Sequence, residues 1–238
     1  MQIIRIFIGV FLAWHICFMV AAAPAAETKF PVHLAIIGLE HDAAGDFISR
    51  VRVRNDVQIV GIVEQNQALV KSYMQLLNLG TNVFYPDLES LLAKTNVQAA
   101  AVFTTTLNHR ATVEACASHK IDVMLEKPLA VNMDDALAMA SAARSNGIQI
   151  VVNYETSWYP SIGTAYTIAQ KQHAIGELRK IIVMAGNQGP KDAGCSDVFL
   201  DWLTDPALNG GGALTDFGCY GVDLITWFMG DQRPDAVF

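Results

Sequence analysis

Short apolar runs alternate with amphipathic stretches along most of the chain. Runs rich in Val, Ile and Ala predict strands at residues 32–37, 57–63, 83–85, 97–103, 121–125 and 148–153. The stretches between them predict helices at residues 43–53, 67–78, 87–94, 108–119 and about 132–146. Because strands that are apolar throughout are buried on both faces, this order favours a parallel sheet with helices on both sides.

The pattern changes after Tyr154. The sequence predicts a helix at 161–173, a longer strand at 178–184, a glycine-containing loop, an amphipathic stretch at 198–203 and a helix at 213–229. One strand cannot form a sheet, so this part is expected to be incomplete. The expected fold class is therefore α/β. A Rossmann-like doubly wound parallel sheet occupies residues 30–153, and an incomplete α+β C-terminal domain occupies residues 154–238.

The second part also carries more large apolar side chains than its predicted elements can cover. We expect some of the following to stay exposed: Leu214, Phe217, Ile225, Trp227 and Phe228. The second part is accordingly expected to be loose or prone to association.

The first 26 residues have a different composition. A short basic start is followed by an apolar run over residues 6–20 and then by small residues up to Ala26. This order is typical of a Sec-type signal peptide at residues 1–26. An uncleaved membrane anchor is the alternative, but about 20 apolar residues are needed for a span. We therefore expect an exported protein, periplasmic or secreted, whose mature chain begins near Glu27.

Composition excludes several classes of partner. The 238 residues carry a formal net charge of −7 and show no basic stripe, so no nucleic acid partner is expected. No stable membrane partner is expected for the mature chain either. Cys116 and His119 share a predicted helix face, but two ligands do not make a metal site, and no metal is expected.

The loop after the first strand partly matches a dinucleotide fingerprint. Gly38, Leu39 and Ala43 fit the pattern, whereas Glu40 stands where the middle glycine normally lets backbone approach a diphosphate. A carboxylate there repels a diphosphate unless it turns to solvent. Asp42 is a candidate cap for the following helix. The alternative is an ordinary strand–turn–helix.

Glu64 ends the second predicted strand. An acid at this position accepts hydrogen bonds from the adenosine ribose and repels a 2′-phosphate. The next basic residue, Lys71, comes too late for a phosphate clamp. This favours NAD over NADP as the cofactor; the alternative is a solvated acid at a strand end.

Two further motifs carry candidate chemistry. Glu126-Lys127-Pro128 closes the fifth predicted strand, where doubly wound folds bind ligands. Asp216 and Tyr220 lie four residues apart on the last predicted helix and therefore share a face. Lys127 is a candidate for holding a substrate hydroxyl, and its charge is expected to bring the pKa of Tyr220 towards the working range. The alternatives are an exposed strand-end lysine and a tyrosine in helix packing.

This pair of motifs resembles the Gfo/Idh/MocA family of nicotinamide-dependent oxidoreductases, from about Val32 to the last residue. Tyr220 places the resemblance in the branch of glucose–fructose oxidoreductase and dihydrodiol dehydrogenase. The resemblance implies that Lys127 positions and polarises the substrate, that Tyr220 moves the proton and that Asp216 assists. Family members continue beyond this length with further strands, so the chain resembles a C-terminally truncated member, and a family-like homo-oligomer would need the complete sheet.

The resemblance extends to the turn after the fourth strand. Thr104, Thr105 and His109 match a family turn that lies beside the cofactor; the alternative is a Thr-rich helix cap with His109 as a packing residue. Glu126 is expected to orient Lys127 or the nicotinamide ribose. Four residues at the domain junction and beyond are expected to line the substrate pocket, with hinge packing as the alternative for the first three: Asn153, Tyr154, Trp158 and Asp223.

The function expected from these motifs is hydride transfer between NAD and an alcohol carbon of a small, sugar-like or cyclic polyol-type substrate. The rival is a non-catalytic secreted carbohydrate- or nucleotide-binding relative, or an inactive truncated product. No sequence feature identifies the substrate or the direction of the reaction.

Overall fold

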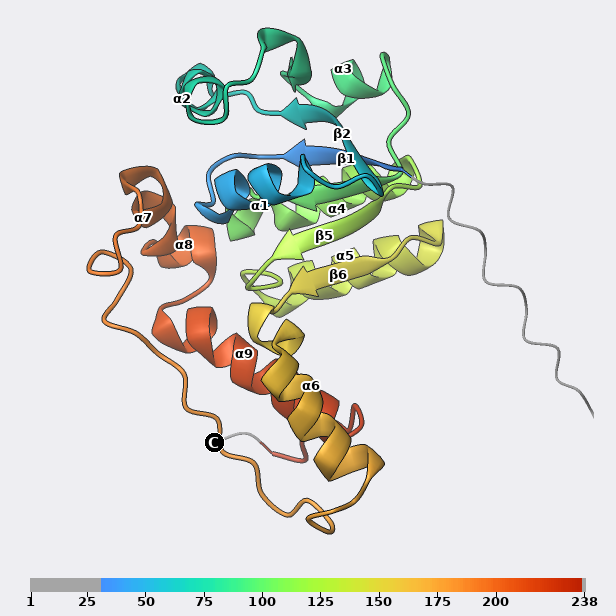
Figure 1. Ribbon diagram of the computed structural model, residues 1–238, viewed down its shortest axis with the longest axis vertical. Coiled ribbons are helices and arrows are strands. Elements are labelled where there is room, and N and C mark those ends of the chain that lie inside the picture. The colour runs from blue at the N-terminus through green and yellow to red at the C-terminus, as the bar shows by residue number, and fades with distance from the viewer. Residues whose placement is uncertain (1–30, 237–238) are drawn as a thin grey trace, which may run out of the picture.

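The computed structural model describes residues 31–236, so the predicted signal peptide at 1–26 lies outside the described residues. The described part divides into a sheet with its helices and a more extended second part (Figure 1). Within residues 31–236 no helix has the length and apolar character needed to cross a membrane. The same residues contain no group of three or more His, Cys, Asp or Glu side chains suited to a metal ion.

The sheet is parallel, with the strand order β3-β2-β1-β4-β5-β6. Its strands are β1 (Val32–Ile37), β2 (Val57–Val63), β3 (Phe84–Tyr85), β4 (Ala99–Val102), β5 (Asp122–Glu126) and β6 (Ile150–Asn153). This is the doubly wound order, and it confirms the expected fold class. The order reverses between β1 and β4, so the crevice at their carboxyl ends is where a ligand is expected.

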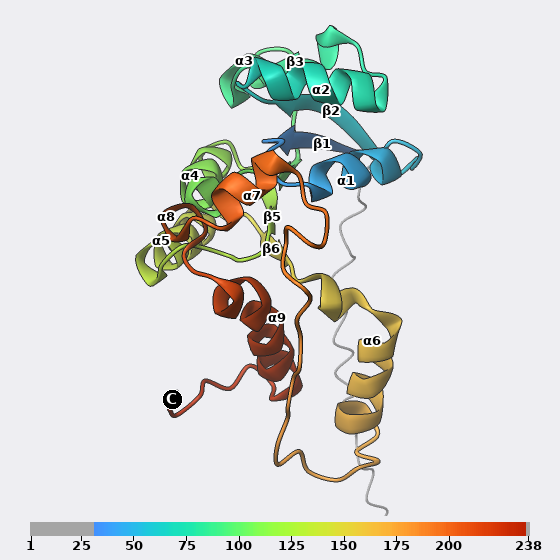
Figure 2. The ribbon, with the colours of Figure 1, turned by 90° about the vertical axis from the view of Figure 1, so that its left-hand side faces the viewer.

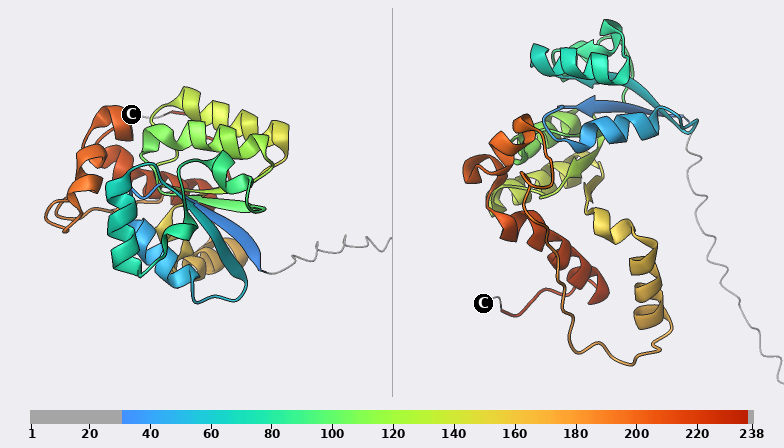
Figure 3. Two further views of the ribbon diagram at one scale, coloured as in Figure 1. Left: turned by 90° about the horizontal axis from the view of Figure 1, so that it is seen from above. Right: turned by 60° about the vertical axis from the view of Figure 1, so that its left-hand side comes forward.

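Alternate residues of the strands build two separate cores. Leu34 and Ile36 of β1 pack against α1 (Ala43–Val51) and α2 (Gln67–Leu77). Ala35 and Ile37 face the other side, towards α3 (Leu88–Leu92), α4 (His109–Ser118) and α5 (Met133–Asn146). Since successive strand residues point to opposite faces, the unbroken apolar run of β1 serves both cores. Helices lie on both sides of the sheet in the view from above (Figure 3).

Side-chain caps set several helix starts. Asn66, Asp87 and Asn132 each accept backbone N–H groups at the first turn of α2, α3 and α5. Gly147 follows α5 with φ +70°, as the glycine after this helix predicted. These local signals explain why the predicted helix ranges of the first part are confirmed to within a few residues.

The second part is helical with long connections. It contains η3 (Glu155–Trp158), α6 (Pro160–Tyr166), the π-helical turn η4 (Thr167–Lys171), α7 (Asp197–Leu203), α8 (Pro206–Asn209) and α9 (Ala213–Phe228). In Figure 1, α7 and α8 lie beside the edge towards which the strands point, and α9 follows below them. Figure 2 shows the long connection from α6 back to α7.

The strand predicted at residues 178–184 is wrong. This segment forms no strand, and Ile182 and Met184 are exposed. A strand is stabilised by hydrogen bonds to a neighbour, and no strand lies within residues 154–236 to pair with it. Residues with a high strand propensity therefore do not form a strand here without a neighbouring strand to pair with.

The expected surplus of apolar surface is confirmed for Leu214 and Ile225 of α9, which are exposed. The end of the helix is better covered. Tyr166 of α6 stacks on Trp227 with ring centroids 4.5 Å apart and meets Phe228 edge-on at 5.4 Å. These aromatic contacts hold α6 and α9 together.

Candidate active site

The loop after β1 touches the turn after β4. Gly38 has φ +82°, and a Cβ on it would lie 2.5 Å from Cγ2 of Thr104. Only glycine fits at this position, for both conformational and steric reasons. The close approach brings the two turns together at the point where the strand order reverses.

A crevice of about 510 Å³ opens at these strand ends. Its lining comes from β1, β2 and the β4–α4 connection: Ile37, Gly38, Glu40, Val63, Glu64, Gln65, Asn66, Thr104, Asn108, Ala111 and Thr112. Gly38, Glu40, Glu64 and Thr104 of the predicted cofactor set therefore share one cavity. No lysine or arginine lines it, so the crevice offers no cation to a 2′-phosphate.

Glu64 is buried at the end of β2. Its carboxylate accepts the backbone N–H of Leu39 at 2.9 Å and that of Asn66 at 2.7 Å. Burial raises the pKa of the Glu64 carboxyl, and these hydrogen bonds oppose the rise. Glu64 thus ties the fingerprint loop to β2 while it lines the crevice.

Glu40 does not turn to solvent. It is partly buried in the crevice wall, and its Oε2 has no hydrogen-bond partner. Burial, and then the nearby charge of Glu64, raise the pKa of the Glu40 carboxyl. A raised pKa favours the neutral acid, which reduces the repulsion expected for a diphosphate at this loop.

Asp42 does not cap α1. Its backbone is helical, at φ −59° and ψ −25°, and its side chain makes no cap hydrogen bond. Nδ1 of His41 instead accepts the N–H of Ala43 at 3.1 Å. The Asp42 carboxylate binds Ser196, accepting its N–H at 2.8 Å and its Oγ–H at 2.6 Å.

The residues in and after the turn that follows β4 have different surroundings: one lines the crevice, and another is packed in the interior. Thr104 lines the crevice, whereas His109 is buried outside it, with Nδ1 3.1 Å from the carbonyl oxygen of Leu129. Burial lowers the pKa of His109 to about 4, so the ring is neutral. Of the two alternatives for His109, the structure supports the packing residue. Thr105 is partly buried, and its Oγ1 has no partner.

Lys127 and Asp216 form a buried ion pair that joins β5 to α9. Each side chain is only 12% exposed. The Lys127 Nζ atom also lies 5.6 Å from the ring centroid of Tyr220 and 5.8 Å from that of Phe217. The structure therefore brings together the predicted catalytic residues from the two parts of the chain.

The pKa of Tyr220 moves in the opposite direction from the sequence prediction. Burial raises the pKa of its hydroxyl, and nearby acids, with Glu155 first, raise it further. The Lys127 charge is paired with Asp216 and faces the ring, so it does not offset burial. Tyr220 is consequently a protonated phenol in this state.

Glu126 and Asn153 pair across neighbouring strands. Nδ2 of Asn153 donates to Oε1 of Glu126 at 2.8 Å. Burial raises the pKa of Glu126. Asn153 is therefore placed beside the Glu126-Lys127 corner and not in a hollow with the other predicted substrate residues.

The other three predicted substrate residues share a hollow of about 370 Å³ along β6. Tyr154, Trp158 and Asp223 line it with Ser157 and Trp227. Asp223 accepts the hydroxyl of Ser157, and burial raises the pKa of Tyr154 to about 12. Trp158 is 65% exposed, so an aromatic face is open at this hollow.

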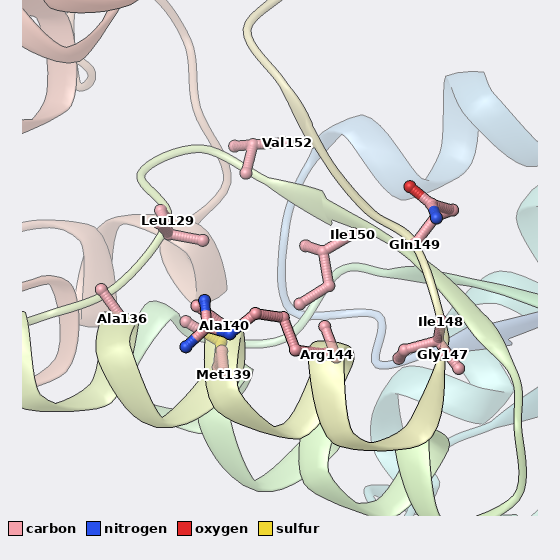
Figure 4. Close-up of a pocket in the computed structure, with 11 residues that line it drawn as sticks. Leu129, Ala136, Met139, Ala140, Arg144, Gly147, Ile148, Gln149, Ile150 and Val152 are labelled. Atoms are coloured by element: carbon pink, nitrogen blue, oxygen red, sulfur yellow. The ribbon is translucent and has the colours of Figure 1, made fainter.

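A further hollow of about 520 Å³ lies between α5 and β6 (Figure 4). Met139, Ile150 and Val152 make part of its apolar wall, and Arg144 and Gln149 contribute polar side chains to its lining. None of the predicted site residues lines this hollow. It is therefore separate from the candidate active site.

Sequence reasoning missed the residues that hold the two parts together. Nε1 of Trp202 donates to the Glu40 carbonyl oxygen at 3.1 Å. Asn209, fully buried, accepts the hydroxyl of Thr106 at 2.8 Å. Gly210 has φ +83°, and a Cβ there would lie 2.6 Å from Val131, just after the Lys127 corner. Only the glycine run gave a signal; the other contacts join residues about one hundred or more positions apart, which no local pattern reveals.

Comparison with known proteins identifies the family. The model of the oxidoreductase family with an NAD-binding Rossmann fold, GFO_IDH_MocA, matches residues 32–154. The model of the GFO/IDH/MocA C-terminal domain matches residues 169–238. The first match alone covers more than half of the chain.

Individual relatives are more distant. The trans-1,2-dihydrobenzene-1,2-diol dehydrogenase of Sus scrofa is 26% identical over 196 residues, which are 82% of this chain and 55% of that enzyme. The same enzyme of Macaca fascicularis is 28% identical over 184 residues, 77% of this chain and 52% of that enzyme. This chain thus spans about half the length of these relatives.

Solved structures share the fold. The aldose-aldose oxidoreductase of Caulobacter crescentus, complexed with glycerol, superimposes with a TM-score of 0.67 at 21% identity, covering 84% of this chain and 58% of that one. The myo-inositol 2-dehydrogenase of Lactobacillus plantarum gives 0.65 at 22%, covering 84% and 57%. Together with the two family models, these likenesses show that this chain belongs to the Gfo/Idh/MocA oxidoreductase family.

Proposed function

We propose that this chain forms the cofactor-binding and reacting part of an oxidoreductase that transfers hydride between NAD and an alcohol carbon of a small sugar-like or cyclic polyol-type substrate. The observation that supports this most is the buried Lys127–Asp216 pair beside Tyr220. Lys127 follows the last residue of β5, so this ion pair lies at the edge formed by the strand ends. The crevice lined by Gly38 and Glu64 opens at the same edge.

The crevice has the features that a dinucleotide needs. Gly38 allows close backbone approach, and Glu64 offers carboxylate oxygens to ribose hydroxyls. Thr104 places a second turn along the same wall, and Leu39 and Ala43 complete the fingerprint loop. NAD is favoured over NADP because an acid and no cation lines the ribose end. When bound, the nicotinamide supplies the redox chemistry.

Lys127 acts on the substrate oxygen, and Asp216 assists it. The ammonium attracts the negative character that develops on a carbonyl oxygen during reduction, in a site shielded from water. Asp216 holds the Lys127 Nζ atom in place across the junction of the two parts. Glu126, held by Asn153, fixes the strand end from which Lys127 projects.

Tyr220 moves the proton. Its raised pKa keeps the hydroxyl protonated, which suits donation to an oxygen that becomes an alkoxide. In this state the site is therefore better prepared for carbonyl reduction than for alcohol oxidation, which needs a deprotonated base. The hollow of Tyr154, Trp158 and Asp223 is proposed to hold the rest of the substrate. An aromatic face beside a carboxylate suits a polyhydroxylated ring.

Glu40 supports a second candidate, a non-catalytic nucleotide- or carbohydrate-binding relative. Its partly buried carboxyl narrows the place where a diphosphate comes closest to the backbone. Under this candidate, adenosine binds at Glu64 but a full dinucleotide binds weakly.

The same proposal has two further parts. Residues 30–153 form the cofactor part and residues 154–238 the substrate part, and the protein is exported through a signal peptide at residues 1–26. Export is tested by sequencing the N-terminus of protein recovered outside the cytoplasm. A start near Glu27 supports it, and a retained Met1 favours an anchor.

Two measurements test the function itself. Titration with NADH, followed by its fluorescence, is expected to show saturable binding that is tighter than for NADPH, whereas adenosine alone as the best ligand would favour the binding relative. Absorbance near 340 nm during reaction of bound NADH with a panel of aldoses, inosose-type ketones and cyclic diketones then tests turnover. Saturable NADH binding with no oxidation by any carbonyl compound would contradict the catalytic part of the proposal.

A further inference from the structure

Three consecutive residues of the fingerprint loop, Glu40, His41 and Asp42, all contact one segment of the second part. Asp42 holds Ser196 with two hydrogen bonds. The Glu40 carbonyl oxygen accepts Nε1–H of Trp202. The His41 ring lies 4.4 Å from the ring of Phe199 and 5.9 Å from that of Trp202. These contacts join residues more than 150 positions apart.

The centre of this contact is well packed. The rings of His41, Phe199 and Trp202 are all buried, and Phe199 meets Trp202 edge-on at 5.0 Å. His41 also caps α1 through Nδ1, so the neutral ring carries its proton on Nε2, which is buried without a partner. Burial, followed by the charges of Lys127 and His109, lowers the pKa of His41 to about 3. The outer side of the loop is thus held by packing of neutral aromatic rings and by two polar contacts, Asp42 with Ser196 and Glu40 with Trp202.

The inner side of the same loop is the wall of the crevice. Gly38 and Glu40 line the crevice, whereas Phe199 and Trp202 do not. A ligand that lies against the backbone of Gly38 and Leu39 needs this loop in one conformation, and its exchange is easiest when the loop can open. A segment that holds the loop from outside therefore controls exchange without touching the ligand.

We propose that residues 196–203 act as a clasp on the Glu40-His41-Asp42 loop and slow the release of a bound dinucleotide. The inference rests on the proposed NAD binding but goes beyond it, because it assigns a role to residues that do not line the crevice. The rate of cofactor release then depends on the contact between the loop of the first part and residues 196–203 of the second part. An enzyme that works away from the cytoplasmic NAD pool needs such retention.

A double-mutant cycle on the polar edge tests the clasp. Asp42→Ala, Ser196→Ala and the double variant are compared by stopped-flow release of NADH. One hydrogen bond corresponds to a change of up to about tenfold in an equilibrium, so each single variant is expected to release NADH about three- to tenfold faster. Asp42→Ala removes both hydrogen bonds to Ser196, whereas Ser196→Ala removes only the one from its Oγ, so the double variant should be no faster than Asp42→Ala alone.

Asp201→Ala is the matched control, since it also removes one exposed carboxylate, from α7 itself. Its release rate should equal that of the unaltered chain. Release rates that are unchanged in all variants, or that multiply in the double variant, overturn the clasp while the proposed NAD binding stands. Absence of NADH binding to the unaltered chain overturns the proposed function and the clasp with it.

Hydrogen exchange gives a readout without cofactor. Trp202→Phe keeps an aromatic ring but removes the N–H that Glu40 accepts. The amides of residues 38–45 should exchange faster in this variant and in Asp42→Ala, but not in Asp201→Ala. Equal exchange at residues 38–45 in all four proteins would show that α7 does not hold the loop.

Discussion

The two regions of the chain, residues 32–153 and residues 154–236, bury their apolar side chains in different ways. In the first region two cores cover both faces of the sheet, and the largest fully buried side chains, from Ile36 to Met139, all belong to it. In the second region the buried cluster consists of Phe199, Trp202 and Leu203, which pack next to the loop after β1. The first region has cores of its own, whereas the buried cluster of the second region lies where it touches the first.

This difference follows from whether the backbone N–H and C=O groups of a segment find a neighbouring strand to pair with. Each strand of the first region pairs within the sheet. In the second region the segment at 178–184 has β-type residues but no neighbouring strand, so it forms no strand and leaves Ile182 and Met184 exposed. Local patterns thus determine a structure when the partners are also present in the described chain. The candidate active site lies on the boundary, because Lys127 comes from one region and Tyr220 from the other.

The largest expected effect concerns this boundary. Tyr220→Phe or Lys127→Met should lower turnover by about 10²–10⁴-fold, the usual range for loss of a proton-transfer group. NADH binding should survive, because the crevice is formed by the first region. The measurement is steady-state reduction of whichever carbonyl compound proves active. Val222→Ala, on the exposed side of α9, is the control. Near-normal turnover in both variants would remove the catalytic roles.

The next prediction compares how much one leucine from each region contributes to the free energy of unfolding. Leu125→Ala in β5 opens a cavity in a closed core and should cost about 2–5 kcal/mol of unfolding free energy. Leu214→Ala in α9 removes an exposed side chain and should stay within about 0.5 kcal/mol. Urea unfolding followed by circular dichroism measures both. Equal losses for the two leucines would mean that something covers α9 in solution.

A third effect is the pH dependence of the first region. His109 is buried and neutral, with its pKa lowered to about 4 from an ordinary 6.5. The unfolded chain therefore binds a proton that the folded chain does not, and stability falls as the pH drops from about 6.5 towards 4. The loss from this residue reaches about 3 kcal/mol at most. Thermal unfolding between pH 7.5 and 4.5 should show it.

His109→Gln should make that pH profile less steep but not flat, because His41, whose pKa is lowered to about 3, keeps its own contribution. It also lowers stability at neutral pH through the lost contact with Leu129. A profile that keeps its full slope in His109→Gln would assign the acid sensitivity to other groups, His41 first among them.

The smallest expected effect lies wholly within the first region. Glu64→Gln keeps an acceptor oxygen but removes the charge that disfavours a 2′-phosphate. The preference for NADH over NADPH should narrow by roughly tenfold or less, the scale of one charge pair in a partly solvated cavity. Fluorescence titration with both nucleotides measures it. If the unaltered chain binds NADPH more tightly, the cofactor assignment is wrong from the start.

The regions also differ in what the sequence could predict. Apolar runs, caps and Gly147 placed every strand and α-helix of the first region, because each signal acts within a few residues. They did not predict the 3₁₀ turns at Thr81–Val83 and Thr106–Asn108. The motifs likewise predicted that Lys127, Asp216 and Tyr220 meet. The pKa of Tyr220 and the partner of Asp42 could not be predicted, since burial and the Ser196 contact arise only when distant segments pack together. The strand predicted at 178–184 failed for the same reason, because pairing is not a local property.

The central claim is that Lys127 acts on the substrate oxygen during hydride transfer, which requires Lys127 to lie beside the bound nicotinamide. Lysine acetylation tests this position without a known substrate. The chain is treated briefly with acetic anhydride with and without saturating NAD, and modification of each lysine is measured by mass spectrometry. Lys127 is 12% exposed and paired with Asp216, so it should react slowly, and NAD should slow it several-fold further. Lys71 and Lys120 should react equally in both samples. A Lys127 rate that NAD leaves unchanged, at concentrations where NAD binding is shown, would contradict the claim.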